Sequence, residues 1–319
     1  MHRSAWVALL VTSFGFGTGG VAARAALGNG VEPYTIAALR AAIAAVALFA
    51  YLFATRGSLP QGRAVWRLGT VLAITNLTMP FAFFTLALQH ASAGLVGLLV
   101  ATLPVGTAIW AHLLLPNEPL HLRKLGGLLL ALAGVAVLLL SGDSGLPEGG
   151  DPLLAAALAL AGISSIAFGV VHAKKAAGNH RVLDLAGPQF AIGALLLTSM
   201  MLVIDGSPTG ISLWGWSLIG YMAMGSTFLP FTLFYWMLQR TSATQASLVG
   251  YVVPLVAVLG GVILLGERIG PGIAVGGALI LVGVVLTDRA ETRRPGAVVG
   301  EVSALGRRNA TSAESRTDS

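Results

Sequence analysis

The stretch PFAFFTLALQHASAGLVGLLVATLP, residues 80–104, recurs 150 residues further along as PFTLFYWMLQRTSATQASLVGYVVP, residues 230–254. The matches keep their order, from Pro80 and Pro230 to Pro104 and Pro254. After a one-residue deletion they continue, with Glu118 answered by Glu267, Gly127 by Gly276 and Gly134 by Gly283. Such self-similarity indicates two copies of one structural unit. We therefore expect a first repeat over residues 1–141, a linker over 142–151 and a second repeat over 152–288.

Composition places both repeats in a membrane. The chain is 55% hydrophobic and only 10% charged, whereas a soluble domain carries about 25% charged residues. A spanning helix needs about 20 mostly apolar residues. Ten such stretches occupy residues 5–23, 33–54, 68–88, 91–114, 122–141, 152–173, 183–204, 212–238, 241–265 and 270–287. The expected fold is an all-α membrane protein with ten transmembrane helices.

The number of helices in each repeat sets their relative orientation. Five is odd, so the second repeat must enter the membrane upside down relative to the first. Two inverted five-helix repeats are related by a pseudo-two-fold axis in the membrane plane, and transporters built this way hold their substrate near the midplane between the repeats. The pattern therefore favours a transporter that binds a small-molecule substrate within the lipid bilayer.

Charge reports the topology. With both termini in the cytoplasm, the short cytoplasmic loops collect nearly all Lys and Arg residues, and only Arg24 and Arg268 fall outside, as positive-inside topology requires. We expect a bacterial-type inner membrane, an acidic external linker and a disordered cytoplasmic tail over residues 289–319. The alternative for the first stretch is a cleaved signal peptide. The net charge of +6 is spread over the loops, so it does not indicate nucleic-acid binding.

The sequence also resembles a known family. The ends of the fourth and ninth stretches read Leu-Pro-Asn-Glu-Pro over 115–119 and Leu-Gly-Glu-Arg over 265–268. With the two prolines in each repeat, these motifs resemble the EamA-type branch of the drug/metabolite transporter superfamily. In the first repeat, Asn117 and Pro119 replace the Gly and Arg of the family motif. The resemblance implies export or exchange of amino acids, related metabolites or amphipathic compounds by alternating access.

Arg40 is the one charged residue well inside an expected span. A charge at membrane depth is costly and indicates function by default. It would capture a carboxylate or phosphate of the substrate, unless it snorkels to the outer interface or binds helix carbonyls. Gln189 stands at the matching position of the second repeat and keeps a hydrogen-bond donor there.

Prolines in mid-span leave carbonyls without donors, so the helices that contain them are expected to kink and line the pathway. Polar and aromatic side chains near them are candidate substrate contacts, with interface anchoring as the alternative for the aromatic ones. The kink and gating candidates are Pro80, Pro104, Pro230 and Pro254. The substrate-contact candidates are Asn76, Trp110, Ser226, Tyr235, Trp236, Gln245 and Tyr251.

Acidic residues avoid the interior of the spans. Glu118 and Glu267 end the fourth and ninth stretches, where each could cap the helix that follows or act in gating. Proton coupling is left to His112 and His172, whose alternative is an interfacial imidazole. An uncoupled facilitator and a drug-efflux carrier therefore stay open as alternatives to coupled metabolite export.

No cofactor or metal site is expected. Cysteine is absent, and Gly15, Gly17 and Gly20 match a dinucleotide fingerprint only literally, because no βαβ pattern surrounds them. A membrane enzyme acting on lipid-linked substrates is the competing class, and the acid-free spans argue against it. The paired glycines of the repeats, spaced seven apart at 127 and 134 and at 276 and 283, suit either internal packing or a homodimer contact.

Overall fold

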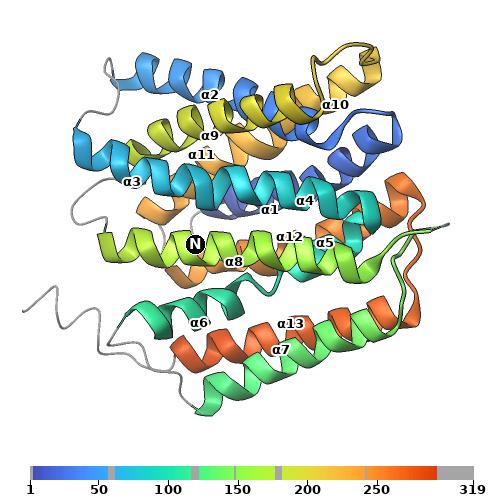
Figure 1. The fold of residues 1–319 in the computed structure, drawn as a ribbon. Coiled ribbons are helices and arrows are strands. Elements are labelled where there is room, and N and C mark those ends of the chain that lie inside the picture. Colours follow the sequence, from blue (N-terminus) through green and yellow to red (C-terminus); the bar gives the residue numbers. More distant parts are fainter. Residues whose placement is uncertain are drawn as a thin grey trace, which may run out of the picture.

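The computed structural model describes residues 3–56, 62–115, 122–146, 149–176, 182–240 and 243–292. Every regular element within these ranges is helical (Figure 1). In chain order the elements are α1 (Arg3–Gly28), α2 (Pro33–Arg56), α3 (Arg63–Ala73), η1 (Ile74–Thr78), α4 (Met79–His90), α5 (Ala93–Val100), α6 (Leu103–Leu114), α7 (Leu122–Leu140), α8 (Pro152–Ala176), α9 (Val182–Ile204), α10 (Leu213–Ala223), η2 (Met224–Phe228), α11 (Leu229–Arg240), α12 (Ala243–Leu265) and α13 (Pro271–Thr292).

Glycine and proline mark the helix boundaries. Pro33, Pro152 and Pro271 are the first residues of α2, α8 and α13, where a missing N–H is harmless. Gly30 and Gly266 adopt φ values of 76° and 66°, a left-handed conformation that glycine reaches without strain. The glycines and prolines that separate the expected spans in the sequence therefore also mark the helix ends in the structure.

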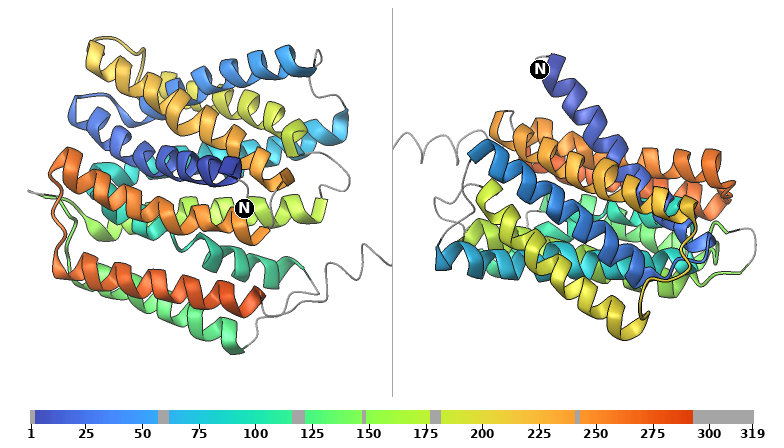
Figure 2. Two further views of the ribbon diagram at one scale, coloured as in Figure 1. Left: turned by 180° about the vertical axis from the view of Figure 1, so that it is seen from behind. Right: turned by 90° about the horizontal axis from the view of Figure 1, so that it is seen from above.

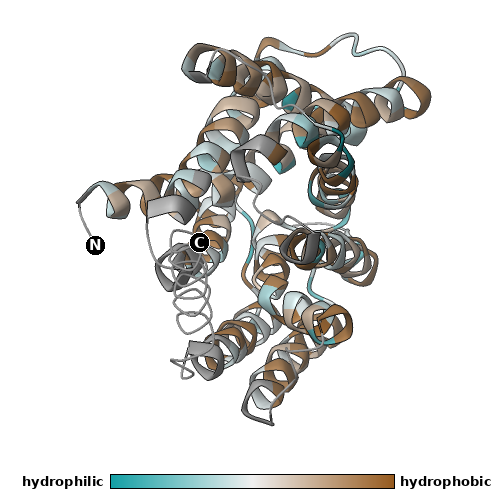
Figure 3. Cartoon of the chain, turned by 90° about the vertical axis from the view of Figure 1, so that its left-hand side faces the viewer, coloured by the Kyte–Doolittle hydropathy of each residue, from teal (hydrophilic) through white to brown (hydrophobic). Residues whose placement is uncertain are grey.

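The helices are long and apolar enough for a bilayer. Seven meet the length and hydropathy of a membrane span, and three shorter apolar helices lie within residues 125–140, 249–265 and 271–287. Large apolar side chains also cover the outer surface: Leu140 is 87% exposed and Val203 is 85% exposed. Brown, hydrophobic stretches run along most helices in Figure 3. Such a surface is suited to lipid rather than to water.

The two ends of the bundle differ. One end, which we call the linker end, carries the connection between the halves, and its loops are joined by backbone bonds such as Ser92 N to Ser144 O at 2.9 Å and Arg268 N to Gly145 O at 3.2 Å. The opposite end, which we call the basic end, carries the ends of α2, α6, α8 and α11, where the chain's Lys and Arg residues concentrate (Figure 1). The sequence places these basic segments on one side, as the structure does.

Helices from the two halves are interleaved. α1 packs on α12 and α11, while α8 packs on α4 and α6. α7 and α13 lie side by side at one edge in both Figure 1 and Figure 2. A Cβ at Gly127 would lie 2.7 Å from Gly283 O, and one at Gly134 would lie 2.6 Å from Gly276 O. These glycines therefore serve the packing of α7 on α13 inside one chain.

Two expected boundaries differ from the structure, and one proline keeps its expected place inside a helix. The fourth stretch, 91–114, is two helices, α5 and α6, because residues 101 and 102 form a turn before Pro104. α12 continues through Pro254, which lies inside the helix. The C-terminal tail begins later than residue 289, because α13 runs to Thr292; residues 293–319 lie outside the described ranges.

Candidate functional site

A π-helical turn precedes Pro80 in the first repeat and Pro230 in the second. In η1 the N–H of Met79 donates to Ile74 O, five residues back. The next carbonyl in this pattern, Thr75 O, would need a donor at Pro80, which has no N–H. The hydroxyl of Ser165 on α8 donates to Thr75 O at 2.8 Å instead. α8 thus satisfies the carbonyl that the proline leaves free.

The second π-turn has the same backbone pattern, but no side chain of the described residues replaces the hydrogen bond that its proline removes. In η2 the N–H of Leu229 donates to Met224 O, so Pro230 leaves Gly225 O without its helical donor. The neighbour on α1 is Gly15, whose Cβ would lie 2.5 Å from Gly225 O. A glycine here lets α1 approach closely but supplies no hydroxyl. Among the described side chains none donates to Gly225 O, in contrast to Thr75 O.

Arg40 reaches from α2 to this second turn. Its Nε and Nη2 donate to Thr227 Oγ1 at 3.3 and 3.0 Å. The guanidinium carbon lies 4.1 Å from the centre of the Phe81 ring, a cation–π contact. No carboxylate of the described residues pairs with it. Its side chain is half-buried, so a cation without a carboxylate partner among the described residues lies two turns into α2.

Ser226 lies beside Arg40. Its side chain is 1% exposed, and its hydroxyl has no hydrogen-bond partner. A Cβ at Gly19 on α1 would overlap Ser226 Oγ and would lie 3.9 Å from Arg40 Nη2. Gly19 therefore lets Ser226 pack directly against α1 beside Arg40. Most buried hydroxyls are paired, so an unpaired one beside a cation without a carboxylate partner is a candidate ligand contact.

Aromatic rings lie next to these polar groups. Phe81 and Phe190 are buried in one cluster with α2 alanines, against which Phe231 packs. Phe231 meets Phe190 and Phe16 edge to face, with ring centres 5.4 and 5.2 Å apart. The site thus combines one cation, hydroxyl groups and ring surfaces contributed by both halves of the chain.

Asn76 and Trp110, which the sequence grouped with Ser226, lie in a separate cluster. Trp110 Nε1 donates to Ser164 Oγ at 3.1 Å, and its ring meets Phe168 edge to face at 5.2 Å. Phe168 stacks on His172 at 5.8 Å. Asn76 lies beside Thr75, with Thr75 Oγ1 donating to Asn76 Oδ1 at 3.2 Å. This cluster joins η1 and α6 to α8.

The remaining candidates are dispersed. Gln189 is 2% exposed and lies on α9 where Gly69 of α3 approaches its backbone. Trp236 packs on the cluster of Ala8, Leu9, Met237 and Val249, and Tyr251 packs on the main core. The side chains of Tyr235 and Gln245 lie outside the described part of the chain, as does Glu118. The sequence missed Thr227, Phe81 and Gly19, although Thr227 adjoins a candidate and Phe81 follows a matched proline.

Glu267 has a different role from the one expected. Its carboxylate accepts from the backbone N–H of Ala93 at 2.7 Å and of Gly94 at 3.1 Å. It therefore caps α5, in the other half of the chain, rather than α13, which follows it. Burial raises the pKa of this carboxyl, while the two N–H groups and the charge of Arg24 oppose that rise. Asp205 caps α2 similarly, accepting from Thr35 N at 2.6 Å. Both caps hold the linker end together.

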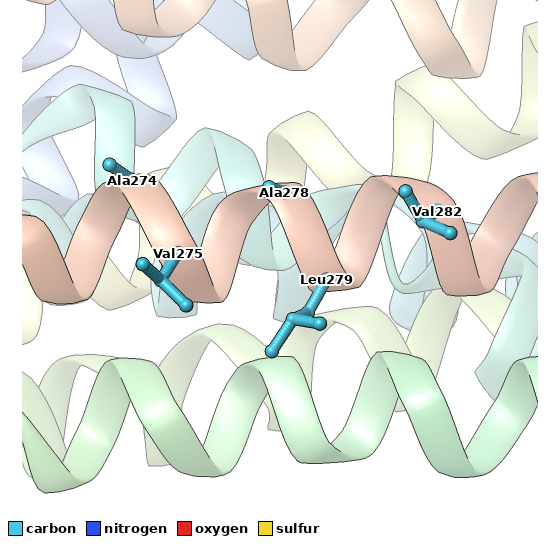
Figure 4. A pocket seen from close by; sticks show the side chains of 5 residues that line it. All are labelled: Ala274, Val275, Ala278, Leu279 and Val282. Carbon is cyan, nitrogen blue, oxygen red and sulfur yellow. The ribbon is translucent and has the colours of Figure 1, made fainter.

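A shallow hollow of about 370 Å³ lies on the surface of α13, lined by Ala274, Val275, Ala278, Leu279 and Val282 (Figure 4). Figure 4 shows that all five side chains come from this one helix. None can form a side-chain hydrogen bond, so the hollow suits an acyl chain and not a polar solute. It is distinct from the Arg40 site. No group of three or more potential metal ligands occurs among the described residues.

Comparison with known proteins places this geometry in context. A model of the EamA-like transporter family matches twice, over residues 3–140 and 153–288. An uncharacterized transporter of Archaeoglobus fulgidus is 25% identical over 81% of this chain and 88% of its own. The uncharacterized inner membrane transporter YedA of Escherichia coli is 28% identical over 75% and 77%. A solved crystal structure matches with a TM-score of 0.62 and 19% identity over 93% of this chain and all of its own, which shows a shared fold.

Proposed function

Because the chain belongs to the EamA-like transporter family, we propose that it is a secondary transporter that exports amino acids or related small metabolites by alternating access. The observation that supports this proposal most directly is that α5 and α6, on either side of the break before Pro104, pack against different helices. α5 packs against α12 at the linker end, whereas α6 turns away at Pro104 and packs on α8. Such an arrangement closes one end of a pathway and separates the helices at the other.

The contacts at the linker end support a closed gate there. A Cβ at Gly97 of α5 would lie 2.5 Å from Ala257 Cβ of α12, and one at Gly94 would lie 3.4 Å from Val258 Cα. Glu267 adds its two hydrogen bonds to α5. At the basic end, Gly106 of α6 approaches α8 instead, with a Cβ distance of 3.3 Å to Ala167. Rocking one half against the other would exchange these two arrangements.

The repeat supports ten spans in two inverted halves. The family model matches each half separately, and both halves carry a π-turn followed by proline, 150 residues apart. We place both termini in the cytoplasm, since the basic end then faces inward as the positive-inside rule requires. In this orientation the closely packed linker end faces outward, and a solute for export would load from the basic end.

An uncoupled facilitator is the second candidate. The observation that favours it is the absence of Asp and Glu from the middle of the described helices, because proton-coupled carriers commonly relay through such groups. His172 is half-buried against Phe168 and is the titratable group best placed to offer coupling. Flux with and without a proton gradient separates the two mechanisms.

The test starts from cells that overproduce the chain, compared with cells that overproduce an unrelated inner-membrane protein to the same level. We expect one or a few metabolites to accumulate in the medium only in the first case. Each is then tested in liposomes containing the purified chain, where saturable flux is expected. Unchanged external metabolites together with no saturable flux would contradict transport. Acceleration by an imposed proton gradient would indicate coupling, and its absence would indicate facilitation.

A further inference from the structure

We propose that Arg40, Ser226 and Thr227 form the binding site for a small organic monoanion with an apolar body. The proposal rests on the transport function proposed above and narrows its substrate class. The site lies where α1, α2, α4 and η2 meet, so it is built from both halves of the chain. This is the position from which rocking of the halves exposes a solute to either side in turn.

Charge is the first reason. Arginine stays protonated in proteins, and a lone cation at membrane depth is costly. Arg40 is not paired with a carboxylate of the described residues; its contacts are Thr227 Oγ1 and the Phe81 ring. A ligand with one negative charge would neutralise the site, and the loaded site would then carry no net charge through the membrane interior.

Hydrogen bonding is the second reason. Nε and one N–H of Nη2 point at Thr227, which leaves the N–H groups on the Nη1 side of the guanidinium for a ligand. A carboxylate binds that edge with two parallel bonds. Ser226 Oγ has no partner and packs against Gly19 close to Arg40 Nη2. Arg40 and Ser226 can therefore donate to one anion.

The phenylalanine rings near Arg40 indicate the chemistry of the rest of the ligand. Arg40 lies over Phe81, and Phe81 shares a cluster with Phe190 and Phe231. Phe16 of α1 meets Phe231 from the other side. Phe81 and Phe190 are themselves buried, but Phe16 and Phe231 are half-buried and leave apolar ring surface near the cation. A ligand with a charged end and an apolar or aromatic body therefore fits both parts of the site.

The polar groups at this site disfavour an amino acid as the ligand. An α-ammonium group would need a carboxylate or several carbonyls in a desolvated site. The acceptor identified on this wall is the neutral carbonyl of Gly225, beside Gly15. Asp205 is committed to the N-terminus of α2 and Glu267 to that of α5, both at the linker end. A monocarboxylate without an amino group matches the site better than a zwitterion does.

The test compares three ligands that share one body. The purified full chain in detergent is titrated with 3-phenylpropionate, with its amide 3-phenylpropanamide and with phenylalanine, and thermal stabilisation is measured. We expect the anion to bind at least about 10-fold more tightly than the other two, since a charge-assisted pair contributes about 1.5–3 kcal/mol. Arg40→Gln should remove this preference, and Arg40→Lys should retain part of it.

Ser226→Ala provides the variant that tests the site without risk to folding, because the hydroxyl has no partner to lose. It should weaken binding of the anion by roughly 3- to 10-fold and should not lower the unfolding midpoint without ligand, because an unpaired buried hydroxyl costs stability. Ser199→Ala on the exposed face of α9 is the matched control and should change neither. Equal binding of anion and amide, or tighter binding of phenylalanine, would overturn the monoanion class.

Binding and transport are separable outcomes. If the chain exports a neutral or zwitterionic metabolite and 3-phenylpropionate does not bind, the inferred site is wrong while the transport function stands. If 3-phenylpropionate binds with the expected variant pattern but no solute moves across liposomes, the site is correct and the proposed transport is wrong.

Discussion

At the scale of single residues, Ser165 is the side chain whose removal should lower the stability of the fold most directly. Its hydroxyl supplies the donor that Pro80 cannot give to Thr75 O. Ser165→Ala would leave a buried carbonyl unpaired, which costs about 1–3 kcal/mol. We expect a lower thermal midpoint for the purified variant. Ser199→Ala, whose exposed hydroxyl bonds within its own helix, is the control; an equal midpoint for both variants would show that Thr75 O needs no donor.

Sequence reasoning found individual residues of the site but not their grouping. Arg40 and Ser226 were candidates because one is a charge inside a span and the other is a polar residue near a proline. Arg40 and Ser226 lie beside α1, whereas Asn76 and Trp110 lie beside α8. Which helices pack against α1 and which against α8 is not visible in any local sequence pattern. Thr227 was missed because a threonine in an apolar helix usually bonds to its own helix and gives no separate signal.

At the scale of helices, the boundaries were largely predictable, because proline and glycine mark them in the sequence. The π-turns were not, since they accommodate Pro80 and Pro230 without ending the helix. The contrast between Pro104, after a break, and Pro254, inside α12, could not be foreseen either. Equivalent prolines in the two halves occupy different packing environments, and the environment decides whether the helix breaks.

The contact between α7 and α13 offers a test at this scale. A side chain at Gly134 would meet the backbone of Gly276 at 2.6 Å and Ile280 N at 2.7 Å, so Gly134→Leu must push the helices apart. Overpacking of this kind costs about 1–3 kcal/mol or more. Gly126→Leu on the same helix meets nothing within 4 Å and should be neutral. The yield of monodisperse protein and its unfolding midpoint measure both variants; an equally stable pair would contradict close packing here.

At the scale of the whole molecule, we expect Glu267 to link closure of the linker end to pH in the proposed transport cycle. In the closed form burial raises its pKa, against the opposing effect of Ala93, Gly94 and Arg24; in an open form the solvated carboxyl would have an ordinary value. The closed form then binds a proton more tightly, so its stability relative to the open form is greatest at low pH. It is lost as pH rises from the ordinary pKa through the raised one.

That dependence can be measured at Leu98 of α5, which is 5% exposed and packs on Gly277. Because the chain lacks cysteine, Leu98→Cys introduces a single thiol. Its labelling rate, divided by the rate of the same thiol in Glu267→Gln, should rise with pH, since the ratio removes the ionisation of the thiol itself. A ratio that is flat or falls with pH would contradict the link between Glu267 and closure.

In the proposed alternating-access cycle, α5 and α12 must separate at the linker end once in every cycle. A Cβ at Gly94 would lie 3.4 Å from Val258 Cα and 3.5 Å from its Cγ2, close to the separation that a disulfide spans. Gly94→Cys with Val258→Cys should therefore cross-link on oxidation without displacing either helix. Transport into liposomes should be lost on oxidation and return with reductant, while each single variant is unaffected. Undiminished flux through fully cross-linked protein would mean that solute passes without opening this end, which is the behaviour of a fixed pore and not of a carrier.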